Sequence, residues 1–257
     1  SDCLVFALVC IEDTACTPKD KKLVQMVSDR IGRDFIATAE DDTILHTILD
    51  LEQYLGQHID WVAGESFDQL ILRKKMLPNI AARFCTVEMK LRPMHRWWKE
   101  KVGEPVKMQI GFRAGEEGRA KRMLERTNPS GLLEFKDVVG QHSNGNNKWA
   151  TTAWQKPSFP MIEDRIYKEH VHAFWKGKPV RFAKHNNCIG CFHRNPIMLR
   201  KVAEDHGQKF EWFINQEHTV GGRWKKDASY KEISSRGLQL TLDWNDFTEC
   251  DSGHCGL

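Results

Sequence analysis

The sequence lacks a hydrophobic run long enough to cross a membrane. The longest run, Cys3 to Ile11, is about half the length that a membrane-spanning helix needs. No basic residue precedes it, as one would in a signal peptide. The run is instead typical of a strand buried in a parallel sheet. We therefore expect a cytoplasmic protein that has no membrane partner.

A strong charge of either sign is also missing. The 257 residues include 38 Lys and Arg and 35 Asp and Glu, a net charge of +3. This balance is too mild to indicate nucleic-acid binding, although it leaves such a partner open. The length suits one large α/β domain or two small ones.

The eight cysteines do not have the spread spacing of a secreted disulfide protein. Cys188 and Cys191 form a CxxC pair, and Cys250 and Cys255 form a second cluster near the end of the chain. Clustered cysteines without a secretion signal indicate reduced thiols. Cys3, like Cys10, is expected to be a small buried apolar residue.

The first part of the chain has the pattern of an α/β protein. A strand at residues 4–11, a helix capped by Thr17 with Pro18 at its first position, and a strand at residues 34–39 predict the unit of a parallel sheet. Alternating side chains predict another strand at residues 106–112. Further helices are expected at residues 41–54, 66–76, 167–175 and from Pro93 onward. A Gly/Asn-rich loop at residues 141–147 predicts a division into a sheet-based part, 1–140, and a helical, cysteine-containing part, 141–257.

The CxxC pair precedes a predicted helix. Asn195 is a suitable N-cap and Pro196 suits the first helical position. A helix N-terminus favours thiolate over thiol, and thiolates bind metals. Four thiolates suit an iron–sulfur cluster, which we prefer, or a zinc ion. The four could be the two pairs, or Cys85 with the CxxC pair and one C-terminal cysteine; the alternative is a set of thiols without metal.

Two arginines follow the alternating strand. Arg113 and Arg119 would lie beyond its carboxyl end, where ligands bind in open α/β sheets. Guanidinium groups grip phosphate or sulfate through two parallel hydrogen bonds. The alternative is a surface turn with solvated charges.

Four segments together resemble the phosphoadenosine phosphosulfate reductase family, in its phage and bacterial branch. They are Arg83-Phe-Cys-Thr86, Lys90-Leu-Arg-Pro93, Gly111-Phe-Arg-Ala-Gly-Glu116 and Asn187-Cys-Ile-Gly-Cys191. The resemblance covers residues 83–212, about half of the chain. It implies a Rossmann-like fold of the adenine nucleotide α-hydrolase type and an adenine nucleotide or sulfonucleotide as ligand. It also implies substrate contacts from Arg83, Lys90, Arg113 and Arg119.

The resemblance further implies a 4Fe-4S cluster held by Cys85, Cys188, Cys191 and Cys255, with Cys250 as the alternative to Cys255. A nucleophilic cysteine, Cys250 or Cys255, would attack the sulfate sulfur, and a thioredoxin-like reductant would resolve the product. This chain departs from the family in having Phe84-Cys85 where a pair of cysteines is expected.

The larger departure is the absence of a Ser-Gly-Gly phosphate loop. We expect that an upstream strand, loop and helix have been lost. An unpaired sheet edge near residues 4–9 would then favour association, for example as a homodimer. Residues 1–257 alone are expected to turn over little or no nucleotide.

Three functions follow from these patterns. The first is a sulfonucleotide reductase-like enzyme of sulfur metabolism. The second is an ATP-dependent sulfurtransferase that modifies nucleic acid. The third is a metal-stapled binding module without catalysis.

Overall fold

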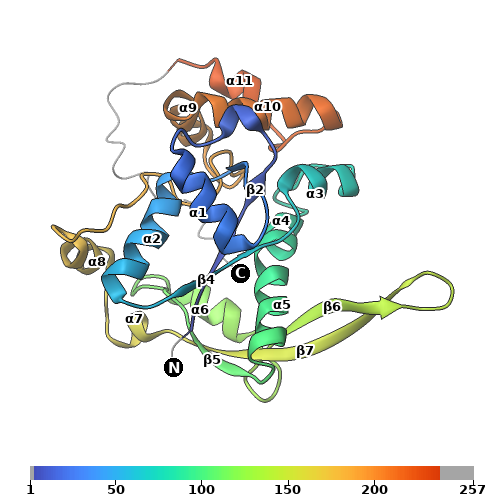
Figure 1. Cartoon of the computed structure of the whole chain (residues 1–257), viewed down its shortest axis with the longest axis vertical. Helices are drawn as coiled ribbons and strands as arrows, with labels where there is room; N and C mark the ends of the chain where they lie inside the picture. The colour runs from blue at the N-terminus through green and yellow to red at the C-terminus, as the bar shows by residue number, and fades with distance from the viewer. Residues whose placement is uncertain (1–2, 238–257) are drawn as a thin grey trace. The chain divides into compact units, whose positions relative to one another are not determined.

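The computed structural model describes residues 3–237 and shows an α/β protein made of two compact units (Figure 1). Unit 1 comprises residues up to 93 and the described residues from 179 onward, and unit 2 comprises residues 94–178. The division expected at residues 140 and 141 falls inside a strand of unit 2, β6 (Leu133–Gln141).

Unit 1 contains the expected parallel strands, but the second strand was misplaced. β1 (Leu4–Leu8) pairs in parallel with β4 (Ile59–Ala63), a strand that the sequence pattern had not indicated. The segment expected to be its partner forms only β3 (Ala37–Thr38), antiparallel to β2 (Cys10–Ile11). Val9 explains the break after β1, because its carbonyl accepts bonds from Ala39 N, at 3.2 Å, and Thr38 Oγ1, at 2.7 Å.

The edge of the parallel pair agrees with the sequence-based expectation. Among the described residues, β1 has one strand partner only, β4. Cys3, expected to be buried, is exposed just before β1, whereas Cys10 is buried in the core. No helix in the described part of the chain is long and apolar enough to cross a membrane.

The first helix of unit 1 begins later than expected. α1 (Lys21–Ile31) is capped by Asp20, whose carboxylate accepts from Lys22 N at 2.9 Å and Leu23 N at 3.3 Å. A carboxylate that accepts two amides is a stronger cap than Thr17 could provide. The other helical segments of this unit are η1 (Thr14–Cys16), α2 (Thr43–Leu55), α3 (Phe67–Lys74), α4 (Phe84–Thr86), η2 (Val87–Leu91), α9 (Pro196–Asp205), α10 (Gly207–Val220) and α11 (Tyr230–Ser234).

Pro93 does not open a helix. It lies inside α5 (Arg92–Lys101), which continues a helical path that starts at Phe84 and passes through the π-helical turn η2. Such turns are rare and often mark functional sites. Gly64, just after β4, packs tightly here: a Cβ on it would lie 2.9 Å from Pro93 Cγ and 3.1 Å from the Glu88 carbonyl oxygen.

The core of unit 1 is rich in aromatic rings. Phe213 of α10 lies 4.8 Å from Trp212, 5.2 Å from Trp224 and 6.3 Å from Tyr230, measured between ring centroids. All four side chains are at most 3% exposed. This part of the core is closely packed, which decides how the CxxC segment can dock.

Unit 2 is built on a three-stranded sheet in the order β5-β7-β6. The expected alternating strand forms β5 (Val106–Gln109), parallel to β7 (Asn147–Ser158). β6 and β7 form an antiparallel hairpin. The loop expected at residues 141–147 contains the turn of this hairpin, whereas the sequence pattern had not indicated the two strands. The helices of this unit, beyond α5, are α6 (Glu117–Leu124), α7 (Pro160–Glu163) and α8 (Lys168–Trp175).

Candidate thiol site

The CxxC segment docks against the chain that leaves β3. Cys188 forms an isolated antiparallel bridge with Glu40, and Ile189 N donates to the Ala39 carbonyl at 2.8 Å. Cys191 N donates to the Cys188 carbonyl at 3.1 Å, which closes the turn between the two cysteines. The segment is therefore held by a backbone bond to the chain after β3 and by a bond within its own turn.

Gly190 allows this segment to sit directly on the aromatic core. A Cβ at this position would lie 2.5–2.7 Å from three ring carbons of Phe213. The buried hydroxyl of Tyr230 donates to the Gly190 carbonyl at 3.0 Å. Only glycine fits here without a shift of the loop or the ring, so the Cys-Ile-Gly-Cys sequence is matched to this core.

Cys85 of α4 joins the pair from a distant part of the sequence. Cys85 and Cys188 both pack against the same hydrophobic cluster of unit 1. Burial raises the pKa of Cys85, and the nearby Cys191 raises it further. Burial also raises the pKa of Cys188 well above its ordinary value, with further contributions from Glu40, Cys191 and Cys85.

The thiols are therefore not activated as the sequence suggested. α9 does begin at Pro196 with Asn195 as its N-cap, since Asn195 Oδ1 accepts from Met198 N at 2.7 Å. The CxxC pair lies upstream of that cap, and burial outweighs any stabilisation of a thiolate by the helix. Without a bound cation, Cys85 and Cys188 are protonated at neutral pH.

An ion pair with a buried carboxylate lies near Cys188 and Cys191. Lys90 Nζ, from η2, lies 2.8 Å from Glu40 Oε1, and the Glu40 side chain is 4% exposed. Burial lowers the pKa of Lys90, but Glu40, Cys188 and Cys191 together raise it above its ordinary value. The positive charge of Arg83, the residue before α4, lowers the pKa of Cys85, but burial has the larger effect and the net pKa is raised.

The three thiols were expected to be metal ligands. Three thiols are present, and their softness suits iron or zinc. Among residues 3–237, however, no three His, Cys, Asp or Glu side chains converge closely enough to hold a metal ion. Cys250 and Cys255, the candidates for a further ligand and for the nucleophile, lie outside the described residues. The described side chains therefore do not form a metal site unaided.

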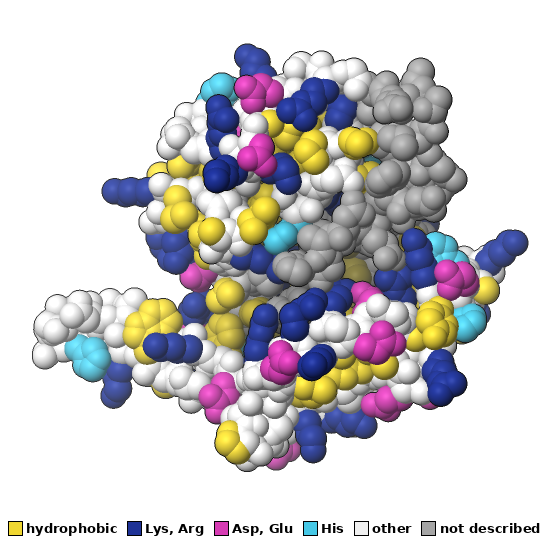
Figure 2. Space-filling model, turned by 180° about the vertical axis from the view of Figure 1, so that it is seen from behind, with side chains coloured by type: hydrophobic (Ala, Val, Ile, Leu, Met, Phe, Trp, Pro, Cys, Tyr) yellow, Lys and Arg dark blue, Asp and Glu magenta, His cyan; other side chains and the backbone are white. Residues whose placement is uncertain are grey.

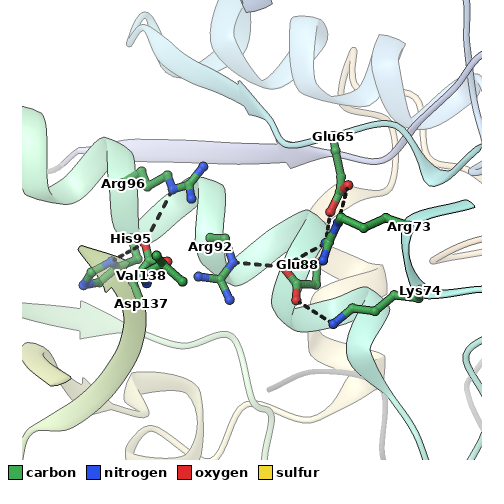
Figure 3. A network of polar contacts seen from close by, with 9 residues as sticks. All are labelled: Glu65, Arg73, Lys74, Glu88, Arg92, His95, Arg96, Asp137 and Val138. Carbon is green, nitrogen blue, oxygen red and sulfur yellow. Dashed lines mark hydrogen bonds and ion pairs between the residues drawn. The ribbon is translucent and has the colours of Figure 1, made fainter. Parts of the chain in front are cut away.

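The π-helical turn that carries Lys90 is fixed by a second acid, Glu88 (Figure 3). Glu88 lies 2.9 Å from Arg92 Nε, 3.3 Å from Lys74 Nζ and 3.5 Å from Arg73, which also pairs with Glu65. Burial raises the pKa of Glu88, but the cations outweigh it and the net pKa is lowered. The network ties α3 to the turn and so helps to position Lys90.

The two arginines expected at an anion site lie in unit 2, around the start of α6. Arg113 Nε lies 3.2 Å from Glu116 Oε2, and Arg119 pairs with the other oxygen of the same carboxylate. The Arg119 guanidinium also lies 4.2 Å above the Phe112 ring. An anion that binds here would compete with the Glu116 carboxylate for both arginines.

The structure thus brings five of the sequence-predicted residues together in unit 1: Cys85, Cys188, Cys191, Lys90 and Arg83. Sequence reasoning missed Glu40, although an acidic residue directly after a buried strand was a usable signal. It also missed Tyr230, which no short motif marks. Neither a family model, nor a curated protein, nor a solved structure matches this chain significantly.

Proposed function

We propose that this chain belongs to an enzyme of sulfur metabolism that acts on an adenine nucleotide or sulfonucleotide, as the phosphoadenosine phosphosulfate reductases do. In such an enzyme the parallel strands of unit 1 would be part of a Rossmann-like sheet, and the protein would be cytoplasmic. The observation that carries it is the meeting of Cys85 with Cys188 and Cys191 beside the Lys90–Glu40 pair.

The chemistry of these groups suits a sulfonucleotide. Arg83 and Lys90 provide positive charge for a phosphate or sulfate. A C-terminal thiolate, from Cys250 or Cys255, would attack the sulfate sulfur and release the nucleotide, leaving an S-sulfocysteine. A thioredoxin-like dithiol would then release sulfite, regenerate the cysteine thiol and become a disulfide.

A metal centre is the second part of the proposal. Cys85, Cys188 and Cys191 would be ligands together with Cys255, or Cys250 in its place, in a 4Fe-4S cluster or around zinc. Such a centre would supply folding energy and positive charge next to the buried thiols. ATP-dependent sulfur transfer to nucleic acid and a non-catalytic module remain the alternative functions. Release of sulfite or of pyrophosphate separates the two enzymes from the module.

The nucleotide-binding part of the proposal is tested by equilibrium binding of adenosine 5′-phosphosulfate and ATP. Arg113→Ala should weaken binding by about 1.5–3 kcal/mol, the scale of a hydrogen bond to a charged group, or about 10- to 150-fold in Kd. Glu116→Gln should strengthen binding, because it removes the competing carboxylate. Lys121→Ala, an exposed change on α6, serves as the control. Equal affinities for parent and Arg113→Ala would contradict the assigned role.

A further inference from the structure

The β6–β7 hairpin forms a long arm in unit 2 (Figure 1). Its strands are paired from Leu133 with Gln155 to Gln141 with Asn147. Every residue from 139 to 149 is exposed, so the outer half of the arm is covered by no other described part of the chain. A two-stranded ribbon of this length is marginal by itself and needs an anchor at its base.

That anchor is a group of aromatic rings. His95 of α5 lies 4.7 Å from Phe135 of β6 and 5.4 Å from Trp154 of β7, and Trp98 lies 6.0 Å from Trp154, all between ring centroids. Asp137, the last acid before the outer half, is buried and lies 3.4 Å from Arg96 Nε (Figure 3). The base is therefore fixed, and the outer half is presented to solvent.

The face of the arm opposite to Phe135 and Asp137 carries the exposed indole of Trp149. Val138 pairs with Trp149, and Lys136 pairs with Thr151, so these four residues share one face. The Trp149 side chain is 47% exposed, and Lys136 Nζ lies 5.7 Å from its ring centroid. An exposed aromatic ring beside a cation offers a face on which another ring can stack next to a positive charge.

Positive charge is concentrated in the same unit. Residues 94–178 contain 16 Lys and Arg but 10 Asp and Glu, a net charge of +6, whereas the rest of the chain has −3. The acids of the arm, Glu134 and Asp137, both lie near its base, and residues 138–158 contain none. The lysines of the arm are Lys136, Lys148 and Lys156, and Figure 2 shows Lys or Arg side chains next to hydrophobic ones on it.

We infer that this arm binds single-stranded nucleic acid. The lysines would neutralise backbone phosphates, and an unpaired base would stack on Trp149, the combination by which single strands are commonly held. A duplex fits the exposed indole less well, because its bases are already stacked. The inference does not rest on the proposed nucleotide chemistry, because binding by the arm requires neither a nucleotide nor the thiols.

The test is fluorescence anisotropy of a labelled oligothymidine of about 20 residues, mixed with the intact chain at several salt concentrations without nucleotide. Trp149→Ala should raise Kd about 5- to 150-fold, the cost of losing one stacked base. The double variant Lys136→Gln, Lys148→Gln should lower the slope of log K against log salt by about 1.4. The charge-matched control is Lys99→Gln with Lys121→Gln, which changes two exposed lysines outside the arm. Its affinity should be closer to that of the parent than the affinity of the double variant in the arm.

Two results would overturn the inference. One is binding that is absent, or equally strong in the parent, Trp149→Ala and the double lysine variant. The other is a matched duplex bound more tightly than the single strand. Because the substituted residues are exposed, circular dichroism should show an unchanged fold in each variant.

Discussion

Replacing Gly190 with alanine tests how the CxxC segment is seated. The new Cβ would lie 2.5–2.7 Å from the Phe213 ring, whereas carbon atoms in ordinary contact are about 3.5–4.0 Å apart. A shift of about 1 Å is needed to reach that separation. Phe213 cannot supply it easily, since the ring is 1% exposed and surrounded by other rings. The loop must move and weaken its bond from the Tyr230 hydroxyl.

Overpacking of this kind costs about 1–3 kcal/mol of unfolding free energy, which urea denaturation under reducing conditions measures. Gly207→Ala is the matched control, because a Cβ there meets nothing within 4 Å, and it should change stability by less than about 0.5 kcal/mol. Phe213→Leu added to Gly190→Ala should cost less than the sum of the two single changes. A Gly190→Ala protein as stable as the parent would refute the close packing.

Two further predictions concern charge. Lys90→Met should lower the free energy of unfolding, measured by urea denaturation, by about 3 kcal/mol, because it leaves Glu40 buried without its partner. Adding Glu40→Gln should recover about half of that loss. A Lys90→Met protein that is no less stable than the double variant would contradict the pairing. Burial lowers the pKa of His185 despite its contact with Asp205, so the fold favours the neutral ring and stability should fall as pH drops below the ordinary histidine pKa of about 6.5. Between about pH 7.5 and 5.5, His185→Gln should lose less stability than the parent, while the exposed His218→Gln should follow the parent; parallel curves for all three would refute the role of His185.

Local signals in the sequence located several helices, although Thr17 and Pro93 did not mark helix starts. Asn195 with Pro196 marked the start of α9, and the helix expected at residues 66–76 corresponds to α3. Strands were harder, because β3 has two residues and β4 has five, too few for periodicity to be decisive. The β6–β7 hairpin was missed because its Gly/Asn-rich turn was interpreted as a boundary, although glycine and asparagine also suit a hairpin turn.

The sequence indicated several residues that lie near one another in unit 1, but not what surrounds them. The CxxC spacing and the segment from Arg83 to Pro93 brought out Cys85, Cys188, Cys191 and Lys90. The protonation of the thiols could not be foreseen, because it depends on burial against α10 and α11 and on Glu40, all distant in sequence. A helix start nearby suggested thiolates, and packing reversed that conclusion.

The metal content of the protein is the most direct test of the proposed metal centre. The chain should be prepared anaerobically and its iron and zinc counted per molecule, with an absorption spectrum and a melting curve for each variant. The parent should contain metal, Cys188→Ser should lose it and melt at a lower temperature, and Cys3→Ser, a change at an exposed thiol, should match the parent. A parent without iron or zinc, or a Cys188→Ser protein with unchanged metal content and melting, would contradict a metal centre built on these cysteines.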